Sequence, residues 1–278
     1  MTVQTLPAGA ACQTCPVYNQ AQLKKLGINT EGAQYVVALA GNPNTGKSTI
    51  FNAMTGLRQH VGNWTGKTVA RAEGGFVFGG ETFKVVDLPG TYSLLSTSTD
   101  EEIARDFILF GQPSVTVVVV DATRLERNLN LALQILEITD RVVIALNLMD
   151  EAERHGLRID VRHLSRRLGV PVVPMAARQR KGLEELLATV AQVSRGEIGT
   201  QPHRLSKLPP QIESAVADLT ASVEAEFPGL PNARWVALRL LDGDPTITEA
   251  AQNRTLGDLA RGMTVAPVGD WVPVEAVS

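Results

Sequence analysis

Residues 41–48 read Gly41-Asn42-Pro43-Asn44-Thr45-Gly46-Lys47-Ser48, which matches the pattern G-x-x-x-x-G-K-[ST]. The stretch follows an apolar run of strand composition and opens a helical pattern, which is the setting that this pattern requires. Its glycines let the backbone wrap around an anion, and the helix N-terminus adds a positive partial charge. The sequence therefore predicts a phosphate-binding loop; a chance glycine-rich turn would not account for the flanking strand and helix.

The side chains that end this loop suit nucleotide chemistry. Lys47 would bridge the β- and γ-phosphates, and the Ser48 hydroxyl would ligate Mg²⁺. Thr49, the next residue, is included among the nucleotide-binding candidates.

On both sides of the loop, apolar strand-like runs alternate with helical patterns up to about residue 194, which is typical of a mostly parallel sheet covered by helices. Six strands are expected, at Tyr35–Ala40, Ala70–Phe78, Thr82–Val86, Val115–Val120, Arg141–Leu146 and Val170–Pro174. Helices are expected at Tyr18–Leu26, Thr49–Thr55, Glu101–Phe110, Asn128–Thr139, Val161–Leu168 and Leu183–Val193. Gly79-Gly80 signals a hairpin between the second and third strands, so one edge of the sheet should be antiparallel.

A small helical domain is expected after a polar linker. Three helical patterns, separated by Pro and Gly, lie at Ile212–Phe227, Ala233–Leu241 and Thr246–Ala260. The chain then divides into an N-terminal tail (1–34), an α/β domain (35–196), a linker (197–206), the helical domain (207–265) and a C-terminal tail (266–278).

Composition and charge exclude several classes of protein. Of the 278 residues, 44% are hydrophobic and 20% are charged, which supports a full core and argues against a disordered or collagen-like chain. No apolar run approaches the roughly 18 residues of a membrane-spanning helix, and the N-terminus lacks a secretory signal pattern. The net charge is −3, and residues 208–278 hold ten acidic and four basic residues, which argues against nucleic acid as a partner.

Asn147-Leu148-Met149-Asp150 follows a strand, at the edge of the sheet where ligands bind in such folds. The Asp150 carboxylate can accept hydrogen bonds from the N1–H and the amine of guanine. Adenine has no matching donor pair and would leave the carboxylate unpaired. Asn147 would tie this segment to the phosphate loop. On spacing alone, a helix N-cap at Asp150 is an equal alternative. A third base-contacting loop is expected at Ala176-Ala177-Arg178, whose small residues let a backbone N–H approach the guanine O6.

Asp87-Leu88-Pro89-Gly90 ends the third strand and is the candidate γ-phosphate sensor. Asp87 would hold Mg²⁺ through water, and the Gly90 N–H would reach the γ-phosphate, although D-x-x-G is also a common turn. Upstream, the polar stretch 57–69 contains Gly66-Lys67-Thr68. Thr68 is the candidate for a second Mg²⁺ ligand; its alternative is a β-branched residue at the start of a strand. Such segments order around γ-phosphate and Mg²⁺ and are released on hydrolysis.

Taken in order, GNPNTGKS, the Thr68 segment, DLPG, NLMD and AAR resemble a small GTPase. The stretch GLRQHVGNWTGKTVARAEG is similar to the switch region of the ferrous iron transport protein B (FeoB) family, whose members carry a GTPase domain ahead of a membrane permease. DLPGTYSL and DATRLERNL are also similar to that family. The resemblance covers residues 35–194, and the acidic segment after about residue 200 is similar in position to the family's regulatory helical domain.

This resemblance implies roles for single residues. Asn44 matches the phosphate-loop asparagine that helps to bind a K⁺ ion, which supplies positive charge where an arginine finger would otherwise act. The carbonyls of Gly62 and Trp64 would complete that K⁺ site. Thr68 matches the switch threonine that binds Mg²⁺.

Asn147 and Asp150 match the family's guanine-reading pair, whereas three other positions depart from its pattern. Thr65 stands where proline is frequent. Lys67 replaces a small apolar residue; its ammonium is either solvated or lies near the K⁺ site and weakens the dependence on K⁺. Ala176 replaces the usual serine, which removes a hydroxyl that orients the loop but leaves the next N–H in place.

Slow hydrolysis of GTP is expected, because Thr91 and Tyr92 follow DLPG where a water-positioning Gln or His would stand. Glu101 and Glu102 either organise the attacking water or serve as carboxylates at the start of a helix. The residues expected to carry catalysis are Asn44, Lys47, Thr68 and Gly90.

The resemblance implies a GTPase switch that controls ferrous iron uptake through a permease of the same protein, on the cytoplasmic side of the bacterial inner membrane. Its implied cofactors are Mg²⁺ and K⁺, and its implied partners are GTP or GDP, the permease, small cytosolic regulators and further copies through the membrane part. One alternative is a stand-alone GTPase in ribosome or tRNA maturation, which the acidic C-terminal segment disfavours. Another is a nucleotide-binding module with negligible hydrolysis.

Cys12 and Cys15 are the two cysteines of the chain, and Pro16 follows them. The pair would hold half a metal site or form a redox couple. The alternative is two thiols in a disordered N-terminal tail.

Overall fold

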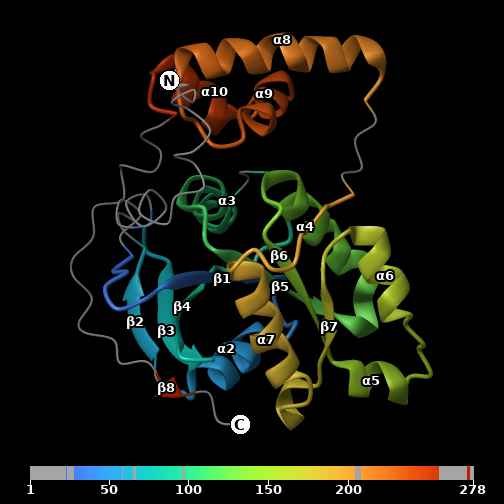
Figure 1. The fold of residues 1–278 in the computed structure, drawn as a ribbon. Coiled ribbons are helices and arrows are strands. Elements are labelled where there is room, and N and C mark those ends of the chain that lie inside the picture. The colour runs from blue at the N-terminus through green and yellow to red at the C-terminus, as the bar shows by residue number, and fades with distance from the viewer. Residues whose placement is uncertain are drawn as a thin grey trace, which may run out of the picture.

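The computed structural model describes residue 23, residues 28–57, 59–64, 67–95, 98–203 and 208–256, and the backbone of 274–275. An eight-stranded sheet forms the centre of these residues, with the order β2-β3-β4-β1-β5-β6-β7 and β8 paired to β3 (Figure 1). The strands are β1 (Tyr35–Gly41), β2 (Gln59–Asn63), β3 (Ala70–Phe78), β4 (Glu81–Asp87), β5 (Val115–Asp121), β6 (Val142–Asn147), β7 (Val172–Pro174) and β8 (Val274–Glu275).

The predicted mixture of parallel and antiparallel pairing is confirmed. Strands β4, β1, β5, β6 and β7 are mutually parallel, whereas β3 runs antiparallel to both β4 and β2. Gly79 and Gly80 close the β3–β4 hairpin with φ of 59° and 80°, values that favour glycine. The six expected strands all form, and β2 and β8 are additional.

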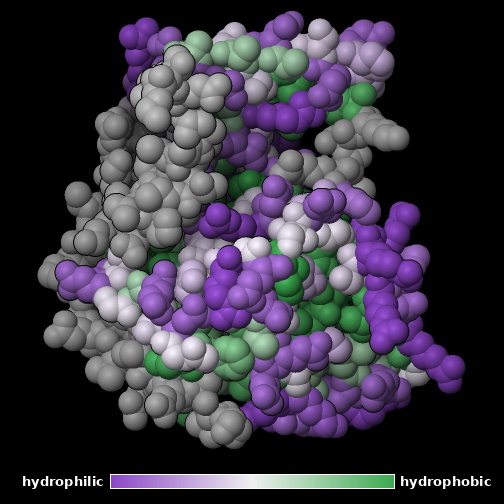
Figure 2. Space-filling model, in the orientation of Figure 1, coloured by the Kyte–Doolittle hydropathy of each residue, from purple (hydrophilic) through white to green (hydrophobic). Residues whose placement is uncertain are grey.

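Helices cover both faces of the sheet (Figure 1). Successive residues of each strand point to opposite faces, so apolar side chains of one strand pack with helices on both sides. Val37 and Leu39 of β1 pack with α2 (Lys47–Thr55) and α7 (Leu183–Ser194). Val36 and Ala38 pack with α3 (Thr99–Gly111) and α4 (Leu125–Ile138), and α6 (Val161–Leu168) covers the same face. Figure 2 shows the hydrophilic outer side of α6, whose sequence is VRHLSRRL.

Short helical turns link these elements. They are α5 (Met149–Arg154) and the 3₁₀ helices η1 (Ala122–Arg124) and η2 (Ala177–Gln179). The sequence did not predict α5, whose six residues are too few for a helical period to stand out.

Three helices, α8 (Pro210–Glu226), α9 (Ala233–Leu241) and α10 (Pro245–Gln252), lie above α3 and α4 in Figure 1. The expected helix Thr246–Ala260 was too long at its C-terminus. The N–H of Arg254 donates to Ala251 and that of Thr255 to Ala250, and Arg254 has a φ of 57°. This pair of bonds is the Schellman arrangement that ends a helix.

No helix among the described residues is long and apolar enough to cross a membrane. The expected domain boundaries stay predictions, with α7 ending at Ser194 and α8 beginning at Pro210 on either side of the expected linker. Of the expected helix Tyr18–Leu26, all residues except Leu23 lie outside the described part, as do Cys12 and Cys15.

Candidate functional site

The phosphate loop joins β1 to α2, as predicted. The backbone is left-handed at Asn44 (φ 65°) and Gly46 (φ 84°), and the Thr45 hydroxyl donates to the Asn42 carbonyl at 2.9 Å. The first turn of α2 has neither an acidic side chain nor a side-chain cap, so its N–H groups are free of the partners that usually satisfy them. The buried amide of Asn42 has no hydrogen-bond partner among the described residues. A polyphosphate would satisfy the N–H groups of the first turn of α2.

Lys47 forms an ion pair with Asp87 at the end of β4. Burial raises the pKa of Asp87, and the Lys47 ammonium opposes that rise. The contact shows that the β4 end meets the start of α2, where Ser48 lies. A hydroxyl and a carboxylate are ligands that Mg²⁺ accepts, so this pair of residues fits the expected ion.

The segment after Asp87 packs on the phosphate loop. The N–H of Leu88 donates to Leu39 at 3.0 Å, and that of Thr91 donates to Gly41 at 3.3 Å. A Cβ placed on Gly90 would lie 3.5 Å from Pro43, so the Gly90 backbone borders the loop. Gly90 therefore lies beside the phosphate loop, and its role as a γ-phosphate sensor stays a prediction.

Asn147 holds three separate segments together. Its Nδ2 donates to the Thr45 carbonyl at 2.9 Å, and its Oδ1 accepts from the Ala177 N–H at 3.1 Å. The expected tie to the phosphate loop is therefore confirmed. The fit is close, because a Cβ on Gly46 would collide with Asn147 Nδ2. The Ala177 N–H, expected to approach guanine O6, is used by Asn147 in this structure.

Asp150 lies in the first turn of α5, whose N-cap is Leu148 with a φ of 62° and no side-chain cap bond. The alternative role of Asp150 as an N-cap is therefore wrong. One carboxylate oxygen accepts from Gln179 Nε2 at 3.1 Å, and Arg154 approaches to 4.0 Å. Nothing in the sequence singles out Gln179, since only the fold of η2 brings it to Asp150. Arg178, in contrast, has a side chain that is 79% exposed.

The described part of the polar stretch that precedes β3 contacts α3. Lys67 Nζ bonds Glu102 Oε2 at 2.9 Å, so the interpretation of Lys67 as merely solvated is wrong. Ser98 caps α3 by accepting from the Glu101 N–H at 3.3 Å, which places both glutamates in its first turn. Thr68 is exposed.

Of the three predicted K⁺ ligands, Asn44 lies in the phosphate loop, and Gly62 and Trp64 lie in and just after β2. Gly62 is paired with Arg71 in the β2–β3 ladder, and the Trp64 carbonyl accepts the Lys67 N–H at 3.0 Å. The Trp64 ring is buried against Phe107. Thr65 and Gly66 lie outside the described residues. Of the remaining candidates, Thr49 lies in α2 and Met149 opens α5, whereas Pro43, Pro89 and Ala176 lie in the loops already described.

Comparison with known proteins identifies two matching families. The family described as "Ferrous iron transport protein B" matches residues 35–190, and that described as "FeoB cytosolic helical domain" matches residues 209–262. The chain is 43% identical over 225 residues to the Fe(2+) transporter FeoB of Salmonella typhimurium, which covers 78% of this chain and 28% of that protein. The transporter of Escherichia coli K12 is 42% identical over 212 residues, covering 75% and 27%. The chain thus spans less than a third of the length of these relatives.

Solved structures agree with these matches. The cytosolic domain of L. pneumophila FeoB is 35% identical with a TM-score of 0.72, covering 82% of this chain and 91% of that one. The T. maritima cytosolic domain in its GMPPNP form is also 35% identical with a TM-score of 0.72, covering 83% and 96%.

Proposed function

This chain belongs to the ferrous iron transport protein B family, and from that premise we propose that it binds GTP with Mg²⁺, hydrolyses it slowly and acts as the nucleotide switch of a ferrous iron transporter. The observation that carries the proposal is the clamp of Asn147 on Thr45 and Ala177. It joins the phosphate loop, the predicted base-reading segment and the third loop into one site.

The phosphates would lie along the phosphate loop. The uncapped N–H groups of α2 and the Lys47 ammonium would neutralise the β- and γ-phosphates. In this structure Lys47 pairs with Asp87, so it would leave Asp87 and pair with a phosphate instead. The Asp87 carboxylate would then be free to hold a water bound to Mg²⁺. Ser48 and Thr68 would ligate the ion directly, and the Gly90 N–H would contact the γ-phosphate. Bound Mg²⁺ would neutralise charge that develops on the phosphate oxygens.

Guanine would be read by Asp150, and binding would displace the Gln179 amide from its carboxylate. In Asp150→Asn, an NH₂ group replaces one carboxylate oxygen and would face the guanine amine, so that two donors meet without an acceptor. The binding free energy of GTP should therefore weaken by about 1–3 kcal/mol. Xanthosine triphosphate should bind this variant more tightly than it binds the parent, because its C2 oxygen can accept a hydrogen bond from the introduced amide. Titration of both nucleotides, with Glu153→Gln on the same helix as the matched control, tests this. Unchanged GTP affinity in Asp150→Asn would remove the base assignment.

Stimulation by K⁺ is the next part of the proposal, with Asn44 and the carbonyls of Gly62 and Trp64 as ligands. Turnover should be faster in K⁺ than in Na⁺, because K⁺ would supply charge beside the transferred phosphoryl group. Asn44→Gly should abolish the difference, since glycine keeps the φ of 65° and removes only the side chain. Equal turnover in both salts for the parent protein would contradict the K⁺ site, and no turnover above background would favour a binding module without hydrolysis.

Control of iron uptake would act through a permease of the same protein, at the cytoplasmic side of the bacterial inner membrane. Small cytosolic regulators and association through the membrane part are further proposed partners. The acidic helical segment favours this function over ribosome or tRNA maturation. Expression of the full-length gene product in an uptake-deficient bacterium tests it. Lys47→Ala should abolish ⁵⁵Fe²⁺ uptake, and uptake equal to that of the parent would show that nucleotide binding does not control transport.

A further inference from the structure

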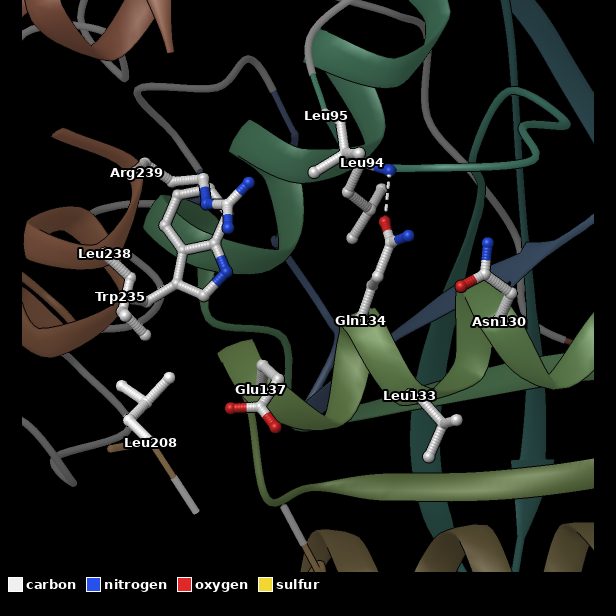
Figure 3. Close-up of a pocket in the computed structure, with 10 residues that line it drawn as sticks. All are labelled: Leu94, Leu95, Asn130, Leu133, Gln134, Glu137, Leu208, Trp235, Leu238 and Arg239. Carbon is white, nitrogen blue, oxygen red and sulfur yellow. Dashed lines mark hydrogen bonds between the residues drawn. The ribbon is translucent and has the colours of Figure 1, made fainter. Parts of the chain in front are cut away.

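Positive charge is concentrated in one stretch of the chain. Residues 154–181 hold eight Lys or Arg residues and one acidic residue, a net charge of +7, although the whole chain has a net charge of −3. The rest of the chain therefore carries a net charge of −10. Elsewhere opposite charges share a surface, as where Glu137 and Arg239 line the same pocket between α4 and α9 (Figure 3). The stretch thus has a local positive potential that the net charge of the chain hides.

Four of these cations lie on the outer side of α6 and on the loop that leads into it. They are exposed, and we call them the α6 face: Arg158, Arg162, Arg166 and Arg167. Arg162 and Arg166 are four residues apart, so they are neighbours on the helix, where like charges destabilise it. Val161, Leu164 and Leu168 pack in the core on the other side of α6. Figure 2 shows the hydrophilic surface that results.

No contact within the described structure accounts for the α6 face. None of its four side chains forms an ion pair or a hydrogen bond with a described residue. They are not needed as caps, because backbone N–H groups of residues 201–203 donate to the carbonyls of Leu168 and Gly169 at 3.1 and 2.9 Å. Asp160, the one acid of the stretch, accepts a backbone N–H at the start of α6 at 2.8 Å. The four guanidinium groups are therefore available to an anion outside the chain.

The composition of this surface distinguishes between kinds of polyanion. All four cations are arginines, whose guanidinium groups form paired hydrogen bonds with phosphate oxygens. Leu157, next to Arg158, is 44% exposed, and its N–H donates to Ala152 at 2.9 Å, which fixes the loop. Residues 154–181 contain no aromatic residue on which a nucleic-acid base could stack. A protein partner would need an apolar interface core, which a single leucine does not supply.

We propose that the α6 face docks on the anionic phospholipid headgroups of a membrane, with Leu157 entering the headgroup region. Basic residues on an amphipathic helix are attracted to such lipids, and an exposed apolar side chain adds to the binding. Because residues 201–203 bond the end of α6, docking also fixes the start of the segment that leads to α8. The proposed permease would hold the chain near a membrane, and to this extent the inference rests on the proposed function.

Flotation of the full chain with lipid vesicles tests the proposal. In about 150 mM NaCl, vesicles of phosphatidylcholine and phosphatidylglycerol at about 3:2 should bind the chain about tenfold more tightly than vesicles of phosphatidylcholine alone. Salt of about 1 M should release the chain, because it screens exposed charges. Equal binding to both vesicles, or none to the anionic ones, would overturn the proposal. Nucleotide and iron are absent, so such a failure would leave the proposed GTP binding untouched.

Two pairs of surface arginines separate the α6 face from the overall charge. Arg162→Gln with Arg166→Gln should weaken binding to the anionic vesicles about 25-fold, roughly fivefold for each cation removed. Arg234→Gln with Arg254→Gln lowers the net charge equally, but these arginines pair with glutamates of the helical segment. This control should bind within about twofold of the parent. Equal weakening in both variants, with the fold checked by circular dichroism, would contradict docking through α6.

Leu157→Trp tests which surface meets the lipid. Brominated phosphatidylcholine in the anionic vesicles should quench the introduced indole, so that quenching exceeds that of the parent. Adding Arg162→Gln and Arg166→Gln to this variant should remove the excess. Quenching equal to that of the parent would place another surface on the membrane, which contradicts the proposal.

Competition with RNA tests the choice of partner. An RNA duplex of about 20 base pairs, added at the same phosphate concentration as the anionic lipid, should leave the chain on the vesicles, because the α6 face offers a duplex phosphate contacts alone. Displacement of the chain by the duplex would identify nucleic acid as the better partner and overturn the proposal.

Discussion

Asp87, at the end of β4, connects that strand to the start of α2 through its ion pair with Lys47. Its carboxylate pairs with Lys47 here and is the proposed holder of the Mg²⁺-bound water. Burial raises its pKa above the ordinary 3.8, while Lys47 acts in the opposite direction. Burial of the ionised Asp87 carboxylate therefore costs free energy that Lys47 offsets only in part, and the proposed Mg²⁺ would offset more of it.

The sign of this shift gives a prediction about stability. A folded-state pKa above that of the unfolded chain means that the folded state binds the proton more readily, so the contribution of Asp87 to the free energy of unfolding falls as the pH rises from 3.8 through the raised pKa. Without nucleotide or Mg²⁺, the unfolding free energy of the parent minus that of Asp87→Asn should grow as the pH is lowered from 7 toward 4.5. Urea unfolding over that range measures it, and a difference that shrinks would contradict the direction.

Single residues were predictable from the sequence where a motif fixes their backbone. Asn147 and Gly46 belong to such motifs, and the structure brings them into contact. Contacts that only the fold creates were not predictable. The bond of Gln179 to Asp150 and that of Lys67 to Glu102 join side chains of ordinary surface type, and neither spacing nor composition marks them.

At the scale of elements, β3 and β4 carry a buried ion triad. Arg71 and Lys84 both pair with Glu73, at 2.8 Å and 2.5 Å, and all three side chains are buried. Lys84 also donates to the Asn29 carbonyl at 2.6 Å, and Arg71 lies over the Trp64 ring. Burial lowers the pKa of Lys84, and Glu73 opposes that change. The triad thus links the first described residues to the segment that carries the proposed K⁺ ligands.

Removal of the shared carboxylate should be far more damaging than removal of all three charges. Glu73→Gln leaves two buried cations without a carboxylate and should cost about 3–5 kcal/mol of unfolding free energy. The triple variant Arg71→Met, Glu73→Leu, Lys84→Met should be close to the parent, because well-packed apolar residues replace buried ion pairs at little cost. Chemical unfolding of both variants decides; a loss below about 1 kcal/mol in Glu73→Gln would mean that water reaches the triad.

Elements with a clear period were predicted, and those without one were not. The sequence QHVGN of β2 is polar and holds its place through backbone pairing with β3, so no alternation marks it. The end of α10 was missed because Arg254, rather than a glycine, takes the left-handed position. The two-residue β8 likewise lacks any period.

At the scale of the whole molecule, Asn232 joins the two parts of the chain. With a φ of 47°, it caps α9 by accepting from the Trp235 N–H at 3.1 Å. Its amide donates to the carbonyls of Glu137 and Ile138 at the end of α4, both at 2.9 Å. Arg105, fully buried in α3, approaches Asp244 of the helical domain to 3.9 Å. The sequence predicted both parts, but not this contact between them, because it rests on side chains far apart in the chain.

Substitutions at Asn232 should separate its two roles. Asn232→Gly keeps the backbone conformation, removes the cap and both α4 bonds, and should cost about 2–3 kcal/mol. Asn232→Asp keeps the cap acceptor but not the donors, so it should chiefly speed amide hydrogen exchange in α8, α9 and α10 while the sheet stays protected. Exchange measured by mass spectrometry checks this, and equal acceleration across the sheet would show that the two parts unfold together.

The clamp formed by Asn147 also sets an order of events during synthesis. Its bond to Thr45 spans 102 residues of chain, and its bond from Ala177 spans a further 30. Contacts so distant in sequence form late, since the entropy of closing long loops opposes them. The phosphate loop leaves the ribosome early but waits for residue 177 before its partners are complete. A nascent chain shorter than that would therefore lack a finished pocket for the proposed nucleotide, which would bind near the end of folding of the sheet domain.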